Sequence, residues 1–466
     1  MSSSKYDIAV IGGGPGGYVA AIRAAQLGLK AVVIEKEHLG GICLNWGCIP
    51  TKALLRSAEI YSYIQHADQY GITVKDAKFD LHKIVDRSRK ISKQLSSGIS
   101  HLMKKNKIDV VMGTAKLSST KAISVQTNDK STSEIKADNI IIATGARARQ
   151  LPNLETDGKL IWSYREAMVP DKMPKKLLII GSGAIGIEFA SFYNSLGMDV
   201  TVAEVQERIL PVEDAEISEL AKKSFEKQGI KIKTKAIVKS FKKKADNVDV
   251  TISLNGKDKV ENFDRVIMAV GVVGNTENIG LEKTKIKIEK GHIATNEWMC
   301  TDEPNIFAIG DVTAPPWLAH KASHEAILAV EKIKGLPNLK PIKKENIPGC
   351  TYCHPQIASI GLTEAKAKEL GNKIKVGRFP FIGNGKAIAL GETEGLIKTI
   401  FAEETGELLG AHLIGAEVTE LINNFALGKT MEATELDFMH TIFPHPTLSE
   451  MLHESVLDAY KKAVHI

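Results

Sequence analysis

Two cysteines five positions apart, Cys43 and Cys48, are the residues of this 466-residue chain best placed for redox chemistry. A disulfide between them would close a very short loop, and it would add little stability because stabilisation grows with loop length. Pro50 predicts that a helix begins near Cys48, and a helix N-terminus stabilises a thiolate. The alternative is two reduced, unrelated core thiols. The flanking glycines and Pro50 favour a disulfide that is made and broken in a reaction.

A second chemistry-bearing pattern occurs twice. In the first copy, a buried-strand pattern at residues 6–11 leads into a G-x-G-x-x-G loop, an alanine-rich helical stretch and a strand that ends at an acid; its key residues are Gly12, Gly14, Gly17 and Glu35. The second copy follows a strand pattern at 177–180, and its key residues are Gly181, Gly183, Gly186 and Glu204. The first glycine and the acid are 23 positions apart in both copies.

This pattern of strand, glycines, helix, strand and acid is typical of dinucleotide binding. The first glycine allows the tight turn, the second lets the backbone approach a pyrophosphate at the helix N-terminus, and the third lets helix and strand pack closely. The acid accepts hydrogen bonds from ribose hydroxyls. The alternative is a glycine-rich turn of an ordinary α/β domain, but two copies with one spacing predict two dinucleotide sites.

The position of the cysteines assigns the two sites. Cys48 lies thirteen residues after Glu35, and a flavin can mediate between a disulfide and a nicotinamide. We therefore expect FAD at the first site and a nicotinamide dinucleotide at the second. Glu204 would repel a 2′-phosphate, its next three neighbours include no cation, and Arg208 is the nearest one. The second site is therefore predicted to prefer NAD over NADP.

Over essentially its whole length the chain resembles the flavin-dependent pyridine nucleotide–disulfide oxidoreductase family. The resemblance is carried by the two glycine loops, the run from Cys43 to Lys52, Ala143-Thr144-Gly145, Glu188, Ile309-Gly310-Asp311 and the run from His445 to Glu450. It implies an α/β fold with two Rossmann-like dinucleotide-binding domains, for FAD and NAD, and a C-terminal α+β dimerisation domain.

The resemblance also implies roles for single residues. Cys43 would be the interchange thiol that meets substrate, and Cys48 the charge-transfer thiol against the flavin. Lys52 would lie near the flavin and pair with Glu188, and Asp311 would bind the ribityl chain. Further contacts are implied with FAD at Thr144, Gly145, Gly310 and Ala319, and with NAD at Gly271.

A histidine near the C-terminus could supply the base that dithiol oxidation requires. His445 lies between Pro444 and Pro446, which stiffen the backbone, and Glu450 could fix its tautomer and raise its basicity. The alternatives are a surface-loop histidine and a glutamate that merely completes a capping box with Thr447. The family resemblance favours catalysis for both residues.

Three positions depart from the family pattern. Trp46 stands where many members have valine, no arginine follows Gly271, and the run 321–325 is less acidic than usual. These departures concern local nicotinamide contacts and the redox states of the centre. They leave the reaction class intact.

The resemblance implies oxidation of a protein-bound dihydrolipoyl group, with NAD as acceptor, by a homodimer. The lipoyl group would belong to a 2-oxoacid dehydrogenase complex or to the glycine cleavage carrier. The alternatives are a related NAD(P)H-dependent disulfide reductase and a non-catalytic flavoprotein that serves as a scaffold subunit. The acid at Glu204 and the intact Cys43, Cys48 and His445 oppose them.

Composition is consistent with a cytoplasmic enzyme. The net charge of +6 is small for 466 residues, so we expect no nucleic-acid partner, and no apolar run approaches a membrane span. Five cysteines indicate a reducing compartment. Cys350 and Cys353 form a C-x-x-C without a second pair, so we interpret them as structural and expect no metal.

The chain is predicted to divide into four segments. They are 1–148, the first part of the FAD domain, with a helical insert near 52–104; 149–276, the NAD domain, with a β-meander near 231–268; 277–346, the return to the FAD domain; and 347–466, the interface domain, with strands and then helices.

Overall fold

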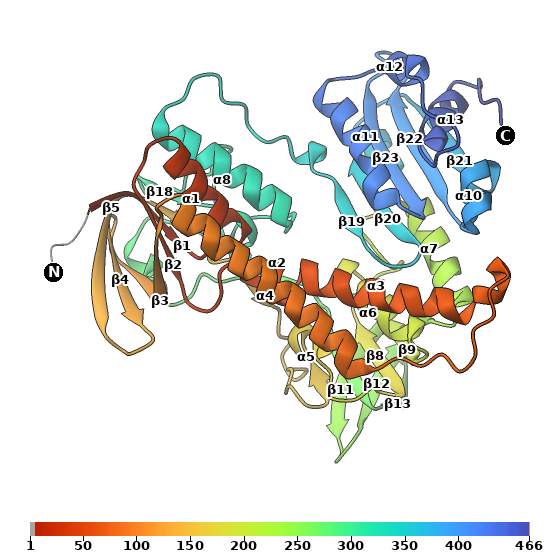
Figure 1. The fold of residues 1–466 in the computed structure, drawn as a ribbon, viewed down its shortest axis with the longest axis horizontal. Coiled ribbons are helices and arrows are strands. Elements are labelled where there is room, and N and C mark those ends of the chain that lie inside the picture. The colour runs from red at the N-terminus through yellow and green to blue at the C-terminus, as the bar shows by residue number, and fades with distance from the viewer. Residues whose placement is uncertain (1–4, 466) are drawn as a thin grey trace. The chain divides into compact units, whose positions relative to one another are not determined.

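The structure is a computed structural model that describes residues 5–465 (Figure 1), and the chain forms two compact units. Unit 1 contains the chain through Ala53, His82–Arg149 and Gly271–Ile342, and unit 2 contains Leu54–Leu81, Gln150–Val270 and the chain from Lys343 onward. The domain boundaries predicted above stay predictions. Among the described residues, no helix is both long enough and apolar enough to cross a bilayer.

A mainly parallel sheet forms the centre of unit 1. Strand β1 lies between β2 and β5, with β3 beyond β2 and β18 beyond β5, and β3, β4 and β5 continue as an antiparallel meander. The strands are β1 (Lys5–Ile11), β2 (Ala31–Glu35), β3 (Asp109–Ser119), β4 (Ala122–Thr127), β5 (Thr132–Ile142) and β18 (Ile306–Ala308). The apolar runs of β1 and β2 suit parallel strands, which are buried on both faces.

Helices and short elements complete unit 1. Helix α1 (Pro15–Gln26) begins with a proline, which suits the first helical turn. It packs beside α8 (Ala319–Lys334), where Arg23 Nε donates to Glu331 Oε1 at 3.0 Å (Figure 1). The remaining elements are α2 (Gly41–Trp46), the start of α3 (Cys48–Gln65), α4 (Leu81–Lys105), the pairs β6 (Ala146–Ala148) with β15 (Val272–Gly274) and β16 (Ile288–Glu289) with β17 (His292–Ile293), and the 3-10 turns η2 (Leu281–Lys283) and η3 (Gly310–Val312).

Unit 2 contains a second parallel sheet, in the order β10-β9-β8-β14-β7. A separate antiparallel sheet, β11-β12-β13, confirms the predicted meander over 236–263, whereas β10 and β14, at the ends of its predicted range, belong to the parallel sheet. The strands are β7 (Ile161–Trp162), β8 (Lys176–Ile180), β9 (Asp199–Ala203), β10 (Lys231–Lys233), β11 (Ala236–Lys243), β12 (Val248–Leu254), β13 (Lys257–Phe263) and β14 (Arg265–Met268). The helices are α5 (Tyr164–Met168), α6 (Ala184–Ser195) and α7 (Ala215–Lys227), preceded in sequence by the turn η1 (Ala67–Tyr70).

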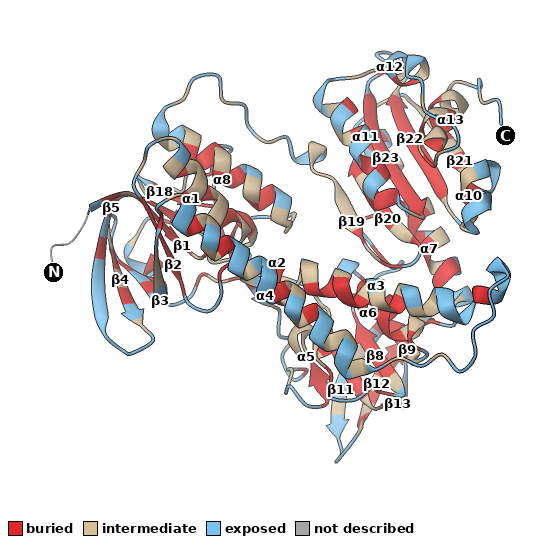
Figure 2. Cartoon of the chain, viewed as in Figure 1, coloured by how far each residue is buried: buried red, intermediate tan, exposed pale blue. Residues whose placement is uncertain are grey.

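The C-terminal part of unit 2 is an antiparallel sheet with helices. The order is β19-β20-β23-β22-β21, and β22 and β23 are buried along nearly their whole length (Figure 2). Its elements are η4 (Lys344–Asn346), β19 (Gly349–Thr351), β20 (Gln356–Gly361), α9 (Glu364–Glu369), β21 (Ile374–Pro380), η5 (Phe381–Gly383), α10 (Gly385–Leu390), β22 (Leu396–Ala402), β23 (Leu408–Gly415), α11 (Val418–Thr430), α12 (Glu435–His440) and α13 (Glu450–Ala459). The predicted order of strands and then helices is thus interrupted by α9 and α10.

A buried ion cluster joins the two parts of unit 2. Lys398 of β22 is 2% exposed, and its Nζ lies 2.8 Å from Asp214 Oδ1, 2.9 Å from Glu216 Oε2 and 2.8 Å from Glu364 Oε2. Asp214 also caps α7 through the backbone N–H of Glu216. Removing one of these charged side chains would leave a buried charge without its partner, which is strongly destabilising. The cluster therefore ties α7 to the C-terminal sheet of unit 2.

Candidate active site

The two predicted redox cysteines lie at the junction of α2 and α3. Cys43 is in the middle of α2, Gly47 ends that helix, and Cys48 is the first residue of α3, as predicted. Both are present as thiols. A hydrogen bond with Cys48 raises the pKa of the Cys43 thiol strongly, and burial and the charge on Cys48 add to this. Cys43 therefore keeps its proton while the Cys48 sulfur accepts the hydrogen bond.

Two predicted site residues act on this pair from nearby. The positive charge of Lys52, one turn into α3, lowers the pKa of Cys43, whereas the carboxylate of Asp311 raises it. Asp311 lies in η3, and burial raises its pKa to about 6; Lys321 opposes this shift and Glu325 adds to it. Unit 1 thus places both cysteines, Lys52 and Asp311 within electrostatic reach of one another.

A buried lysine–glutamate pair supports Asp311. Lys321 Nζ lies 2.7 Å from Glu325 Oε1 and 3.2 Å from the Thr313 hydroxyl. Glu325 Oε2 accepts a hydrogen bond from the Gly310 backbone at 2.7 Å. The pair fixes the backbone beside Asp311, and sequence reasoning missed it. The available signal was the i,i+4 spacing of the two residues on one helix.

In the first glycine loop, neighbouring backbone leaves no room for a side chain at two of the three glycines. A Cβ on Gly12 would lie 2.2 Å from the Ala143 carbonyl oxygen, and one on Gly17 would lie 1.9 Å from the Gly12 carbonyl oxygen. A Cβ on Gly14 would meet nothing closer than 3.8 Å, at Gly41. The space at the second glycine is therefore open to a ligand, which is the position where a pyrophosphate would approach the backbone.

The second glycine loop, in unit 2, has the same properties. A Cβ on Gly181 would lie 2.3 Å from the Ala269 carbonyl oxygen, and one on Gly186 would lie 2.1 Å from that of Gly181. A Cβ on Gly183 would meet no atom within 4 Å. Both loops thus fit a dinucleotide by the same test.

Glu35 and Glu204, the predicted acids of the two dinucleotide motifs, each accept hydrogen bonds from the glycine loop of their own motif. Glu35 Oε2 accepts from the Gly13 backbone at 2.7 Å. Glu204 Oε2 accepts from the Ser182 backbone at 2.9 Å and from the Ser182 hydroxyl at 2.6 Å. Both acids are buried, at 7% and 6% exposed. Carboxylate oxygens accept several hydrogen bonds each, so these contacts are compatible with ribose binding.

The other predicted cofactor residues have clear places. Thr144 and Asn275 exchange two hydrogen bonds, Thr144 Oγ1 to Asn275 O at 2.8 Å and Asn275 Nδ2 to Thr144 O at 2.9 Å. The Asn275 backbone donates to the carbonyl of Gly145 at 2.9 Å. Ala319 is the first residue of α8, where backbone N–H groups attract anionic or polar ligand atoms. Gly271, the predicted NAD contact, belongs to unit 1.

Glu188 is buried in α6, at 5% exposed, and its Oε1 accepts from the Tyr352 backbone at 3.0 Å. Glu188 belongs to unit 2 and Lys52 to unit 1. Their pairing stays a prediction.

The predicted histidine–carboxylate pair is formed. His445 Nδ1 lies 2.9 Å from Glu450 Oε1, and the Thr447 backbone donates to Glu450 Oε2 at 2.8 Å. Burial raises the pKa of Glu450, but the Thr447 and His445 hydrogen bonds outweigh it and lower the value overall. His445 is 78% exposed at its side chain, so its other ring nitrogen can meet a substrate.

The capping-box alternative for Glu450 is only half realised. Ser449 is the N-cap of α13, Glu450 is its first residue, and the Thr447 hydroxyl donates to the Pro444 carbonyl instead. Glu450 therefore orients both the local backbone and the His445 ring.

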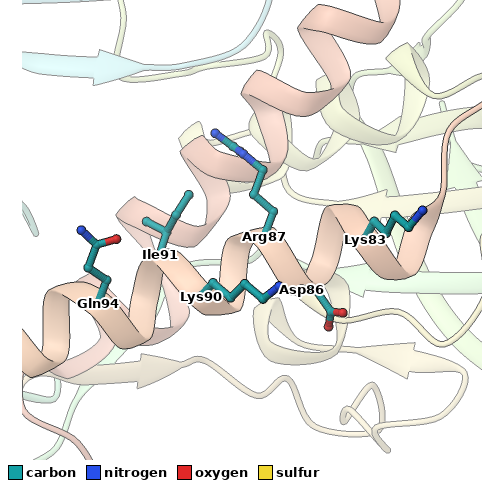
Figure 3. Close-up of a pocket in the computed structure, with 6 residues that line it drawn as sticks. All are labelled: Lys83, Asp86, Arg87, Lys90, Ile91 and Gln94. Atoms are coloured by element: carbon teal, nitrogen blue, oxygen red, sulfur yellow. The ribbon is translucent and has the colours of Figure 1, made fainter.

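A pocket along α4 contains none of the predicted site residues. It is lined by Lys83, Asp86, Arg87, Lys90, Ile91 and Gln94. Figure 3 shows Arg87 directed to the opposite side of α4 from Asp86 and Lys90.

Residues 6–326 match the family described as pyridine nucleotide-disulphide oxidoreductase, and residues 347–456 match the dimerisation domain of that family. The dihydrolipoyl dehydrogenases of Rhizobium etli and Zymomonas mobilis are 54% and 53% identical, with 99% of this chain and 99% and 100% of theirs covered.

Two solved structures share the fold over nearly the whole chain. A crystal structure of LpdA from Mycobacterium tuberculosis is similar with a TM-score of 0.91 and 26% identity, covering 97% of this chain and 99% of that one. The flavoprotein disulfide reductase RclA from Escherichia coli is similar with a TM-score of 0.86 and 25% identity, at the same coverage. On the glycine loops, the paired thiols and these full-length matches, the chain belongs to the pyridine nucleotide–disulphide oxidoreductase family.

Proposed function

We propose that the protein acts as a dihydrolipoyl dehydrogenase, which oxidises a protein-bound dihydrolipoyl group and reduces NAD. The observation that carries the proposal is the hydrogen-bonded pair of Cys43 and Cys48 at a helix N-terminus, beside Lys52 and Asp311. The full-length relatives that bear this name support the choice of substrate.

The thiols perform a disulfide exchange. A substrate thiolate attacks Cys43 of the oxidised pair, the Cys43–Cys48 bond breaks, and the second substrate thiol displaces Cys43 to close the lipoyl disulfide. Two electrons have then passed from the substrate to the protein, which holds a Cys43 thiol and a Cys48 thiolate. Exchange of this kind requires a thiolate as the attacking group, so a base must remove the substrate proton.

His445 is the proposed base. Glu450 accepts a hydrogen bond from Nδ1–H, which leaves Nε2 as the atom that takes the proton. The match of residues 347–456 to a dimerisation domain supports a homodimer. We propose that His445 of one subunit serves the cysteines of the other, so that a two-fold axis builds two shared sites.

The two loops would hold the two dinucleotides. FAD, when bound, supplies two-electron transfer between a dithiol and a nicotinamide. Gly14, Glu35 and Asp311 would hold FAD in unit 1, and Gly183 and Glu204 would hold NAD in unit 2. The carboxylate of Glu204 would repel a 2′-phosphate, which supports NAD over a 2′-phosphorylated dinucleotide.

A direct assay tests the function. The purified, FAD-loaded protein should reduce NAD with dihydrolipoamide, and it should do so far more efficiently than it reduces NADP. Reduction of glutathione disulfide with NADPH would instead identify a related disulfide reductase. A protein that binds FAD but shows neither activity would be a scaffold subunit. The lipoyl carriers of 2-oxoacid dehydrogenase complexes and of glycine cleavage are the partners to compare as substrates.

Subunit mixing tests the shared site. Cys48→Ser and His445→Ala dimers should each be nearly inactive, and His445→Ala should lower the rate by roughly 10²-fold or more. After dissociation and random reassociation, half of the dimers are mixed and each has one complete site, so about a quarter of wild-type activity should return. Continued inactivity, with exchange confirmed by differential tags, would show that both residues act within one chain.

A further inference from the structure

Helix α2, which carries Cys43, is too short to be stable by itself. It contains six residues between Gly40, which has a left-handed φ of 90°, and Gly47. A helix of this length satisfies few of its own N–H and C=O groups, because four at each end have no intrahelical partner. Its position must therefore be set by contacts with the rest of unit 1.

Asn45 supplies contacts at the start of α2. Its buried side chain donates from Nδ2 to the Leu39 carbonyl at 3.1 Å and to the Gly41 carbonyl at 2.8 Å. The Ser96 hydroxyl of α4 also donates to the Leu39 carbonyl, at 2.7 Å. The carbonyl that precedes α2 is thus held from two sides.

Arg89 of α4 supplies the contact at the end of α2. Its Nη1 donates to the Asn45 carbonyl at 2.7 Å, and the guanidinium carbon lies 4.6 Å from the centroid of the Trp46 ring. A cation that binds the last carbonyls of a helix is favoured by the helix dipole. Stacking on the indole adds a cation–π attraction and fixes the plane of the guanidinium. Arg89 is half-buried, and the two residues it touches stand between Cys43 and Cys48.

We propose that Arg89, stacked on Trp46, is a positioning residue for the dithiol–disulfide exchange. By holding the end of α2, it fixes the Cys43 sulfur relative to Cys48 at the start of α3. This inference rests on the proposed function. Their effect on the reacting sulfur atoms is exerted through the backbone of α2, to which Arg89 is hydrogen-bonded at Asn45.

Arg87 provides a matched control on the same helix. Its Nη1 donates to the Ala53 carbonyl of α3 at 2.8 Å, after both cysteines. It is the same residue type and makes the same kind of bond, but to a carbonyl of α3. The variants to compare are therefore Arg89→Met and Arg87→Met, with Arg89→Lys as the conservative replacement and Trp46→Val to remove the stack alone.

The primary measurement is hydrogen–deuterium exchange of residues 41–47 in the FAD-loaded protein, which needs no lipoyl substrate. Arg89→Met should speed exchange there by roughly tenfold or more, and Arg87→Met should leave it near wild type. Arg89→Lys should lie between, because lysine keeps the charge and loses the planar stack. In turnover, Arg89→Met should lower kcat with dihydrolipoamide by roughly 10- to 100-fold. KM and NADH transfer to an artificial acceptor should change little.

Unchanged exchange at 41–47 in Arg89→Met, or the same acceleration in Arg87→Met, would overturn the inference. If Arg89→Met fails to fold, Trp46→Val decides: faster exchange at 41–47 supports the role of the stack, and wild-type exchange contradicts it. If wild-type protein does not oxidise dihydrolipoamide, the proposed function fails, while the exchange comparison still decides whether Arg89 holds α2.

Discussion

The glycine loops of unit 1 and unit 2 begin alike and continue differently. In both, the acid at the end of the second strand binds the backbone of the residue after the first glycine, Gly13 or Ser182. The chain then returns to the carbonyl of that same residue, through the Gly40 backbone at 2.8 Å in unit 1 and the Leu210 backbone at 3.1 Å in unit 2. The hydrogen bonds that shape the two loops are therefore the same.

The difference lies in what the returning chain brings. In unit 1 it continues as α2, the helix that contains Cys43, so closely that a Cβ on Gly41 would lie 2.7 Å from the Gly14 Cα. In unit 2 it continues to Asp214 and α7, with no thiol. Under the proposed function, a common fold for binding gains its redox chemistry from the segment that follows its acid.

Removing Cys48, one of the two thiols that distinguish unit 1, should have the largest effect. Cys48→Ser should lower dihydrolipoamide oxidation by roughly 10³-fold or more, because no disulfide can form. FAD should stay bound, since the first glycine loop is untouched. Partial reduction of the wild type should give a long-wavelength thiolate-to-flavin absorption band that the variant lacks. A persisting band would assign that role to another sulfur.

Changing the acid of unit 2 should alter specificity without altering the chemistry. Glu204→Arg removes a charge that repels a 2′-phosphate and adds a group that binds one. The ratio of kcat/KM for NAD over NADP should fall by roughly 10- to 100-fold, the scale of one or two charge-assisted hydrogen bonds. Glu204→Gln, which adds no phosphate ligand, is the control and should shift the ratio less. An unchanged ratio in both would mean that other residues read the ribose.

The smallest expected effect is a pH dependence confined to unit 1. Burial raises the pKa of Asp311 to about 6. If its carboxylate accepts a hydroxyl of FAD, binding favours the ionised form, so affinity should fall as the pH drops below 6, by at most about tenfold per unit. Titration of FAD-free protein with FAD at pH 5 to 8 measures this slope. Asp311→Asn should flatten it, and a flat wild-type profile would exclude this contact.

The sequence predicted those features whose residues lie close together in the chain. The glycines, both acids and the helix start at Cys48 follow from spacing within some 30 residues, and the structure confirms their placement. The His445–Glu450 contact was predicted for the same reason, since only five residues separate the two. Arg89 was not predicted, because its role depends on how α4 lies against α2, more than 40 residues away in sequence. The contacts of Lys321 and Glu325 with the residues around η3 could not be predicted, because they depend on how α8 packs beside η3.

The middle glycines test the central claim most directly, because the protein's own packing does not require them. Both have extended backbone angles that any residue can adopt, φ of −69° at Gly14 and −68° at Gly183. Gly14→Ala and Gly183→Ala should therefore fold, and the FAD-free form of each should unfold at the same temperature as FAD-free wild type, because bound FAD itself adds stability. FAD content after purification and NADH affinity by calorimetry should be measured for each. We predict that Gly14→Ala loses FAD and keeps NADH affinity, while Gly183→Ala keeps FAD and binds NADH roughly tenfold more weakly or worse. Loss of FAD in Gly183→Ala with full FAD retention in Gly14→Ala, or no effect in either, would contradict the assignment of the two loops.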